Sequence, residues 1–178
     1  MASIDRPDPS EYAPYFERYI ALVPPGDVLM VLREQQDLHL HELEPLTDAQ
    51  ANYRYAPGKW SVKEVVGHLL DCERIFTYRA MSFARGESQP LPGYDDVAYV
   101  TGGRFSTRTL ASLTGEFRAV RGATLALFSN LDASALASRG VANDREYTVR
   151  SIAYIVAGHE LHHWRLFRDR YLPGLPGK

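Results

Sequence analysis

Four stretches of the chain repeat apolar side chains at steps of three and four residues, the spacing that gathers them on one face of an α-helix. These stretches cover residues 27–44, 61–85, 107–131 and 148–171, with polar connections between them. No stretch alternates apolar and polar residues convincingly, as a half-buried strand would. The sequence therefore predicts an all-α four-helix bundle, preceded by a short extra N-terminal helix that ends before Pro24. In such a bundle, side chains on facing helices build the functional site.

Composition narrows the class of protein. The 178 residues suit a single domain, 1–178, and the 20 Lys and Arg against 22 Asp and Glu give a net charge of −2 without charged runs. This balance argues against nucleic acid or an anionic membrane as a partner. Cys72 is the one cysteine, the N-terminal residues lack the pattern of a signal peptide, and no apolar run approaches the roughly 18 residues that span a bilayer. We therefore expect a soluble, cytoplasmic protein of bacterial type.

Two histidines in the last helical stretch indicate a metal site. His159 and His163 are four residues apart, so they lie about 40° apart on the helix surface, and both imidazoles can reach one ion. The same arc carries Ile152, Ile155 and Val156, which places the pair on the buried side. A buried imidazole without a partner costs about 1–3 kcal/mol. Two at this spacing favour a metal over a single core histidine satisfied by a hydrogen bond.

The second stretch offers further ligands. His68 lies at the edge of its apolar face, with Asp71 one turn further on and Cys72 at i+4. A lone helix histidine beside a carboxylate is more often a local hydrogen bond, and a lone cysteine on an apolar arc usually packs. His68 is nevertheless the candidate for a third ligand. His39, in the first stretch, is interpreted as a half-buried surface histidine.

The segment from His159 to His163 also matches the H-E-x-x-H pattern of zinc peptidases, in which the glutamate activates water. The extended form of that pattern requires a glycine and a third histidine downstream, where this chain has Leu166 and Asp169. Glu160 points about 100° away from His159 around the helix, so we expect it to be solvated or in a structural ion pair. The bundle interpretation is therefore preferred to the peptidase.

Arg121 and a long loop are candidates for substrate recognition. Arg121 falls within the apolar stripe of the third stretch, where it needs a carboxylate or an anionic ligand unless its head reaches solvent. The loop of residues 87–107 carries Tyr94 and Asp95 and joins the helix of His68 to that of Arg121. Our hypothesis is that Arg121, Tyr94 and Asp95 line a pocket above the metal. The alternative is a structural Arg121, with Asp71 or Glu64 as its partner.

Three motifs in this order carry a resemblance over nearly the whole chain: YAPGKWSVKEVVGHLLD at 55–71, FRAVR at 117–121 and GHELHH at 158–163. The chain resembles the DinB/YfiT-like superfamily of metalloenzymes, closest to its DinB_2-type branch. The resemblance implies a four-helix bundle, often a homodimer, with a three-histidine metal site. By motif position, the metal ligands would be His68, His159 and His163, and His162 would be a bystander.

The resemblance also implies a choice of chemistries on a small-molecule substrate. Characterised relatives are transferases and isomerases that depend on bacillithiol, mycothiol or glutathione, and others are described as metal-dependent hydrolases. We expect zinc or nickel as the divalent metal, with iron and manganese as alternatives, and a low-molecular-weight thiol as a second cofactor. Hydrolysis would require a base, for which Asp71 and Glu160 are the candidates. A thiol-dependent S-transferase, a hydrolase and a non-enzymatic metal-binding or stress-response module all remain open, so catalysis itself is undecided.

Overall fold

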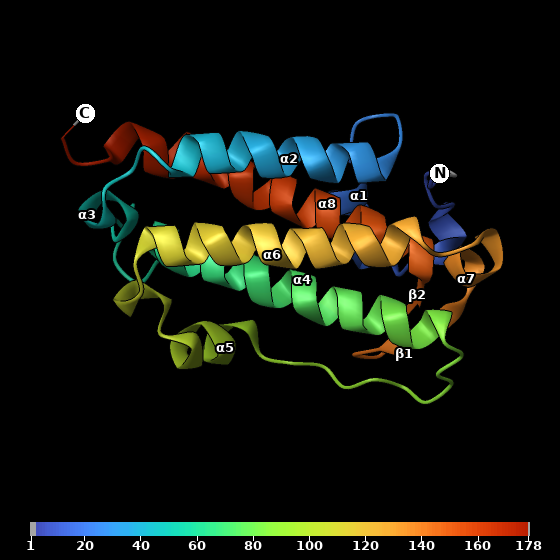
Figure 1. The fold of residues 1–178 in the computed structure, drawn as a ribbon. Coiled ribbons are helices and arrows are strands. Elements are labelled where there is room, and N and C mark those ends of the chain that lie inside the picture. The colour runs from blue at the N-terminus through green and yellow to red at the C-terminus, as the bar shows by residue number, and fades with distance from the viewer. Residues whose placement is uncertain (1–2, 178) are drawn as a thin grey trace.

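Four long helices run side by side along the length of the molecule (Figure 1). In the computed structural model, which describes residues 3–177, they are α2 (Val28–Leu43), α4 (Val62–Ala84), α6 (Leu110–Ser129) and α8 (Val149–Leu166). A π-helical segment, Phe167–Tyr171, and a 3-10 turn, Leu172–Gly174, continue α8. The predicted bundle is confirmed, and each long helix begins and ends within a few residues of its predicted position.

Side-chain caps explain where the long helices begin. The Asp27 carboxylate accepts a hydrogen bond from the backbone N–H of Leu29 at 3.1 Å. Ser61 and Thr148 each form a capping box with the third residue of the helix that follows. These bonds satisfy N–H groups that have no partner within the helix.

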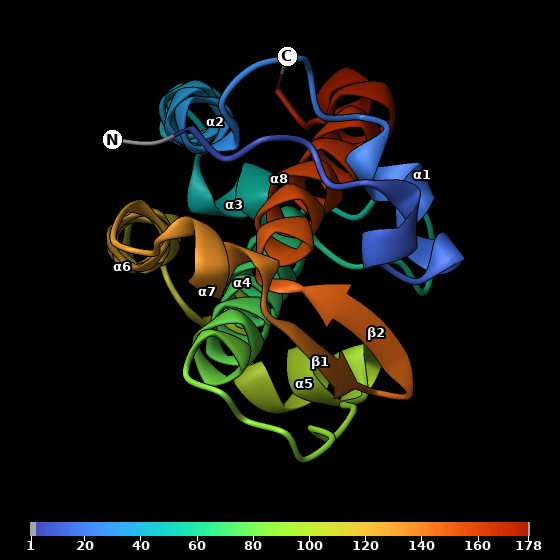
Figure 2. The same ribbon diagram turned by 90° about the vertical axis from the view of Figure 1, so that its right-hand side faces the viewer.

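The four helices form a ring in which chain neighbours are not always spatial neighbours. The main contacts join α2 to α6 and α8, and α4 to the same two helices, so α2 lies diagonally across from α4. Figure 2, which looks along the helices, shows this arrangement. Short connections would make consecutive helices neighbours. Here the connection from α2 to α4, which contains α3 (Asp48–Ala51), is long enough to cross the end of the bundle.

Smaller elements fill the remaining connections. The predicted N-terminal helix is two 3-10 turns, Pro9–Glu11 and Pro14–Phe16, followed by the single-turn α1 (Glu17–Ile20). The long loop after α4 contains α5 (Asp96–Gly103) and a 3-10 turn, Phe105–Thr107. A short helix, α7 (Ala133–Ala137), follows α6.

A β-hairpin corrects the expectation that the chain has no strand. Strands β1 (Arg139–Ala142) and β2 (Arg145–Thr148) pair antiparallel just before α8. The loop between them is Asn143 and Asp144, whose φ angles of 50° and 56° suit a tight hairpin turn. Each strand has four residues, too few for alternation to show in the sequence.

Buried polar side chains divide the core in two. Each long helix contributes apolar residues to one cluster near one end and to a second cluster near the other. In each helix the boundary between the two clusters lies between two apolar residues: Leu32 and Leu40 in α2, Leu70 and Cys72 in α4, Val120 and Phe128 in α6, and Ala157 and Trp164 in α8. In or beside these intervals lie the buried side chains of Gln35, His39, Glu73, Arg121 and Glu160, here called the polar layer.

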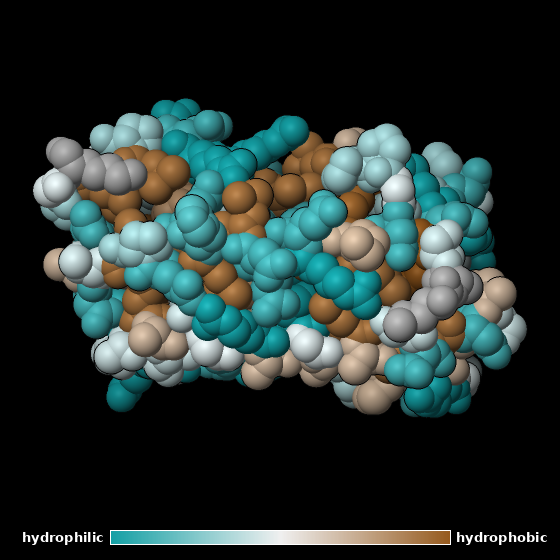
Figure 3. All heavy atoms as spheres, turned by 45° about the horizontal axis from the view of Figure 1, so that its top comes forward, coloured by the Kyte–Doolittle hydropathy of each residue, from teal (hydrophilic) through white to brown (hydrophobic). Residues whose placement is uncertain are grey.

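The outer surface of the bundle is mixed in character. On the face that includes α2, hydrophilic residues separate smaller hydrophobic areas (Figure 3). None of the described helices combines the length and the apolar character needed to cross a membrane.

Gly158 allows α1 to lie directly against α8 beside His159. A Cβ atom at position 158 would lie 2.1 Å from the carbonyl oxygen of Tyr19, far inside van der Waals contact. We expect Gly158→Ala to lower the free energy of unfolding by about 1–3 kcal/mol, because α1 must move away. Gly115→Ala on α6 is the control: a Cβ atom there would have no packing neighbour within 4 Å beyond its own stretch of helix, so the change should stabilise by about 0.5–1 kcal/mol. Equal stabilities of the two variants in urea denaturation would contradict the close packing.

Candidate metal centre

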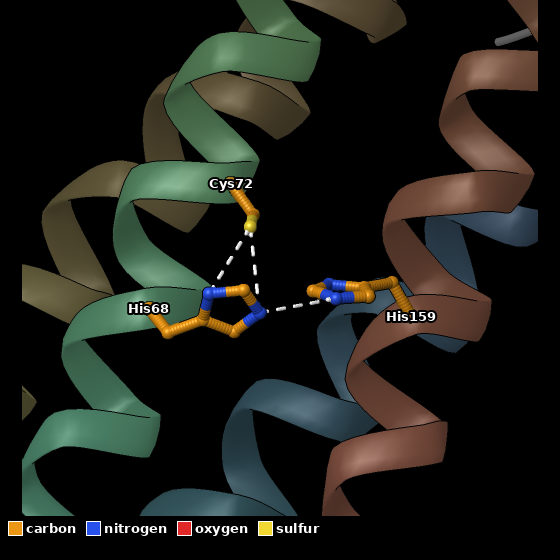
Figure 4. A group of neighbouring side chains, drawn as sticks. All are labelled: His68, Cys72 and His159. Atoms are coloured by element: carbon orange, nitrogen blue, oxygen red, sulfur yellow. Dashed lines mark hydrogen bonds between the residues drawn. The ribbon is translucent and has the colours of Figure 1, made fainter. Parts of the chain in front are cut away.

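The three predicted histidine ligands meet at one place between α4 and α8. The Nε2 atom of His159 lies 3.3 Å from Nε2 of His68 and 3.1 Å from Nε2 of His163. The ring centroids of the three histidines are 5.1, 4.8 and 4.6 Å apart, a nearly equilateral triangle. Figure 4 shows His68 and Cys72 on α4 facing His159 on α8.

This spacing suits a shared divalent ion. Imidazole nitrogens at about 2.0–2.1 Å from a tetrahedral zinc are about 3.3–3.4 Å from each other. In the plane of its ring, an Nε2 atom carries either a proton or a lone pair. A hydrogen bond therefore satisfies one of the two contacts of His159 well, whereas an ion shared by His159 and its neighbours would use the lone pair of each.

Burial keeps the three imidazoles in the form that binds metal. Burial lowers the pKa of His68 to about 4. Burial, with the neighbouring His68 and His162, lowers the pKa of His163 to about 3. For His159, burial and the other two histidines hold the pKa well below its usual value. All three are therefore neutral near pH 7, with a lone pair available for an ion.

Cys72 offers an alternative third donor. Its Sγ atom lies 3.6 Å from Nε2 of His68, and the donor atoms of His68, Cys72 and His159 all lie within 4.8 Å of one another. The Tyr94 hydroxyl already contacts this sulfur at 2.8 Å, and burial raises the pKa of the thiol to about 12. By contrast, Nε2 of His163 lies 3.1 Å from Nε2 of His159, and a neutral imidazole offers its lone pair without first losing a proton. We therefore favour His163 over Cys72 as the third ligand.

A cavity of about 230 Å³ opens beside the histidines. Its lining combines aromatic, basic and polar side chains from the 3-10 turn Pro14–Phe16, α1, α4, the α5 loop, the hairpin and α8: Tyr15, Phe16, Tyr19, His68, Cys72, Phe76, Arg79, Tyr94, Asp96, Asn143, Arg145, Tyr147 and His159. The hairpin, which the sequence did not predict, supplies three of these residues. A small molecule in this cavity would touch two of the candidate metal ligands.

The predicted loop residues have different positions. Tyr94 lines the cavity, where burial raises the pKa of its hydroxyl. Asp95 is exposed and caps α5, accepting hydrogen bonds from the backbone N–H groups of Val97 at 2.9 Å and Ala98 at 3.0 Å. Its neighbour Asp96 is the carboxylate that lines the cavity.

The two candidate bases lie away from the cavity. Asp71 is half-buried with its carboxylate 3.7 Å from Arg74, on the side of α4 that faces α6. Glu160 is 2% exposed and binds Nδ1 of His39 at 2.5 Å and the guanidinium of Arg121. Burial alone would raise the pKa of Glu160, but Arg121 and His39 outweigh it and lower the pKa. Glu160 is thus a member of structural ion pairs, one of the two environments that the sequence predicts for it. Its position does not fit the role of the peptidase glutamate, which activates water.

Arg121 does not line the cavity. It is completely buried, donates to Glu73 through Nε and Nη2 at 2.9 Å each, and donates to the Leu32 carbonyl at 2.6 Å. Glu73 and Glu160 are therefore its partners, in place of the expected Asp71 or Glu64. The reason is geometric: both glutamates lie in the polar layer at the level of Arg121, whereas Glu64 pairs with Arg54 at the first turn of α4.

Sequence reasoning missed three residues of this region. The sequence predicts a half-buried His39, but it is 1% exposed and stacks on Trp164 with ring centroids 3.8 Å apart. Its place within an apolar repeat was the available signal. Glu73 and Arg79 gave no comparable signal, because periodicity does not show which edge of α4 faces which neighbour.

Comparisons with known proteins agree with this architecture. The family model described as the DinB superfamily matches residues 31–167. No curated protein matches the chain significantly in sequence. The structure is similar to YfiT from Bacillus subtilis, described as "a probable metal-dependent hydrolase with an unusual four-helix bundle topology", with 20% identity, a TM-score of 0.71 and 93% of each chain covered.

A second similar structure is a mycothiol-dependent maleylpyruvate isomerase, with 13% identity and a TM-score of 0.67. The match covers 88% of this chain and 63% of the isomerase chain. At these identities, both structures establish the fold alone. Because the family model covers most of the sequence, the chain belongs to the DinB superfamily.

Proposed function

We propose that the protein binds one divalent metal ion through His68, His159 and His163 and uses it in an enzymatic reaction on a small molecule. The observation that carries this proposal is the convergence of three neutral imidazoles, with Nε2 contacts of 3.3 and 3.1 Å, beside a cavity. A site with three protein ligands retains an open coordination position, as catalytic sites do. Zinc or nickel is the proposed metal, and iron and manganese are the alternatives.

Within this function we propose thiol-dependent S-transfer. A divalent ion held by neutral imidazoles lowers the pKa of a thiol or a water molecule that binds it. The same ion would deprotonate water, but hydrolysis also needs a proton donor for the leaving group, and both predicted acid–base residues, Asp71 and Glu160, contact arginines outside the cavity. Transfer by a metal-bound thiolate to an electrophile that needs no such proton can proceed without them, which favours transfer.

Hydrolysis is the second candidate. Asp96 supplies a carboxylate to the cavity lining, and the similar YfiT structure is described as a hydrolase. Turnover assays distinguish a thiol-dependent transferase from a hydrolase. Bacillithiol, mycothiol and glutathione, each with an electrophile, would be assayed beside a panel of esters. Thiol-dependent turnover supports transfer, and ester turnover without thiol supports hydrolysis. Metal binding with no turnover in either assay would favour the non-enzymatic module.

Two adjacent histidines provide a matched test of the metal ligands. His163 faces His159, whereas His162 is exposed. In protein purified without a histidine tag, we expect His163→Ala to lose most of its bound metal in elemental analysis, while His162→Ala keeps the wild-type amount. Equal metal content in the two variants would contradict the proposed ligand set.

The homodimer, the single domain and the cytoplasmic location stay predictions. Light scattering on the purified protein would test the dimer, with twice the chain mass of 20.1 kDa as the expected value.

A further inference from the structure

Three basic side chains are buried among the described residues: Lys63, Arg79 and Arg121. Lys63 pairs with Asp48 at 2.9 Å, and Arg121 pairs with Glu73 and Glu160. Arg79 is 4% exposed and forms no ion pair with any carboxylate in residues 3–177. A buried guanidinium without a counter-charge is costly, so Arg79 differs from the other two.

The contacts of Arg79 are neutral. Its Nη2 atom donates to the carbonyl of Pro92 at 3.0 Å, and its guanidinium carbon lies 5.6 Å from the Phe76 ring centroid and 6.0 Å from that of Tyr94. A guanidinium has five N–H donors in a planar fork that suits a carboxylate. The described bond uses one of them, which leaves donors for a ligand.

The cavity beside the histidines is where such a ligand would lie. Arg79 lines it together with His68 and His159. Arg145 lines it from the hairpin, half-buried, with its guanidinium carbon 3.9 Å from the Tyr15 ring centroid. Arg145 likewise forms no ion pair within the described residues. Against these two positive charges, the lining contains one carboxylate, Asp96.

We propose that Arg79, assisted by Arg145, binds a carboxylate of the ligand and turns the rest of that ligand toward His68 and His159. The orientation toward the histidines rests on the proposed function, whereas the anion site itself does not. Because the cavity is small, about 230 Å³, and has aromatic walls, it suits a compact carboxylic acid or the acidic end of a thiol cofactor. The shared chemistry is the carboxylate.

Matched acids and neutral analogues test the site. Binding of phenylacetate and phenylacetamide would be measured by titration calorimetry, beside glutathione and its diethyl ester. We expect the wild type to prefer the acid of at least one pair by about 10- to 100-fold, the value of a charge-assisted hydrogen bond. A preference within the first pair identifies the substrate as the source of the carboxylate, and one within the second identifies the thiol. Both outcomes support the site.

Variants of single arginines show which side chain causes the preference for the acid over its neutral analogue. Arg79→Met should remove it and Arg145→Met should reduce it, while Arg74→Met, on the outer side of the same helix, should leave it unchanged. Arg79→Lys, which keeps the charge without the planar fork, should retain part of the preference for the acid. This variant also tests the site if Arg79→Met does not fold. The proposal is overturned if neither acid binds the wild type at millimolar concentration, if acids and neutral analogues bind equally, or if Arg74→Met has the effect of Arg79→Met.

Metal content separates this proposal from the proposed function. The titrations would be run on zinc-loaded protein and on protein treated with a chelator. An acid preference that depends on Arg79 in both preparations supports the anion site even if no metal binds stoichiometrically. Stoichiometric metal without any acid preference supports the metal site and overturns the anion site.

Discussion

Arg121→Met is expected to lower the free energy of unfolding by about 3–5 kcal/mol, because it leaves two buried carboxylates without a counter-charge. Arg121 is completely buried and contacts both Glu73 and Glu160 in the polar layer. Urea denaturation of metal-free protein measures the change without any contribution from a bound ion. Replacing both glutamates by glutamine in the Arg121→Met background should recover part of the loss.

Arg118 is the matched control on the same helix. It pairs with Glu44, but both side chains are 48% exposed, so Arg118→Met should change the free energy of unfolding by less than about 1 kcal/mol. If Arg121→Met costs no more than Arg118→Met, the polar layer does not stabilise the bundle. In that case the buried ion pairs are not the reason for the position of Arg121.

His159→Ala is expected to have the largest effect on metal binding. Its Nε2 atom contacts those of both His68 and His163, so its loss removes the central donor. Changes to groups that merely orient metal ligands already cost about 10- to 100-fold in affinity, and loss of a ligand should exceed about 100-fold. Competition with a chromophoric chelator measures this, with circular dichroism to show that the helices remain.

His41→Ala serves as the control for that experiment. His41 is exposed on α2 and contacts none of the three histidines. A loss of affinity in His41→Ala equal to that in His159→Ala would mean that the effect is not local to the centre.

The bundle could be predicted because its information is local. Apolar repeats and caps such as Ser61 and Thr148 define each helix within its own segment. The hairpin could not be predicted in this way, because strands of four residues are stable only where they pack on the bundle. The Asn143–Asp144 turn was visible as a turn, but its strands were not.

The features of the site likewise fall into two groups: those set within one helix, which the sequence predicts, and those set by packing between helices, which it does not. The spacing of His159 and His163 is a property of one helix, and His68 was found from its own helix and from the family resemblance. The partners of Arg121 depend on how the four long helices meet. The missing partner of Arg79 and the burial of His39 likewise depend on packing between helices. Arg121 is expected from the sequence to need a carboxylate or an anionic ligand unless its head reaches solvent. In the structure protein carboxylates supply its counter-charge, and the buried arginine without an ion pair is Arg79.

X-ray absorption at the metal edge of zinc-loaded protein, prepared without a histidine tag, tests the metal centre most directly. We expect imidazole nitrogens from three histidines at about 2.0–2.1 Å, falling to two histidines in His163→Ala, with the remaining ligands nitrogen or oxygen. A sulfur ligand at about 2.3 Å that disappears in Cys72→Ser would contradict this and make Cys72 the third donor. Protein that binds no zinc would contradict the metal site altogether.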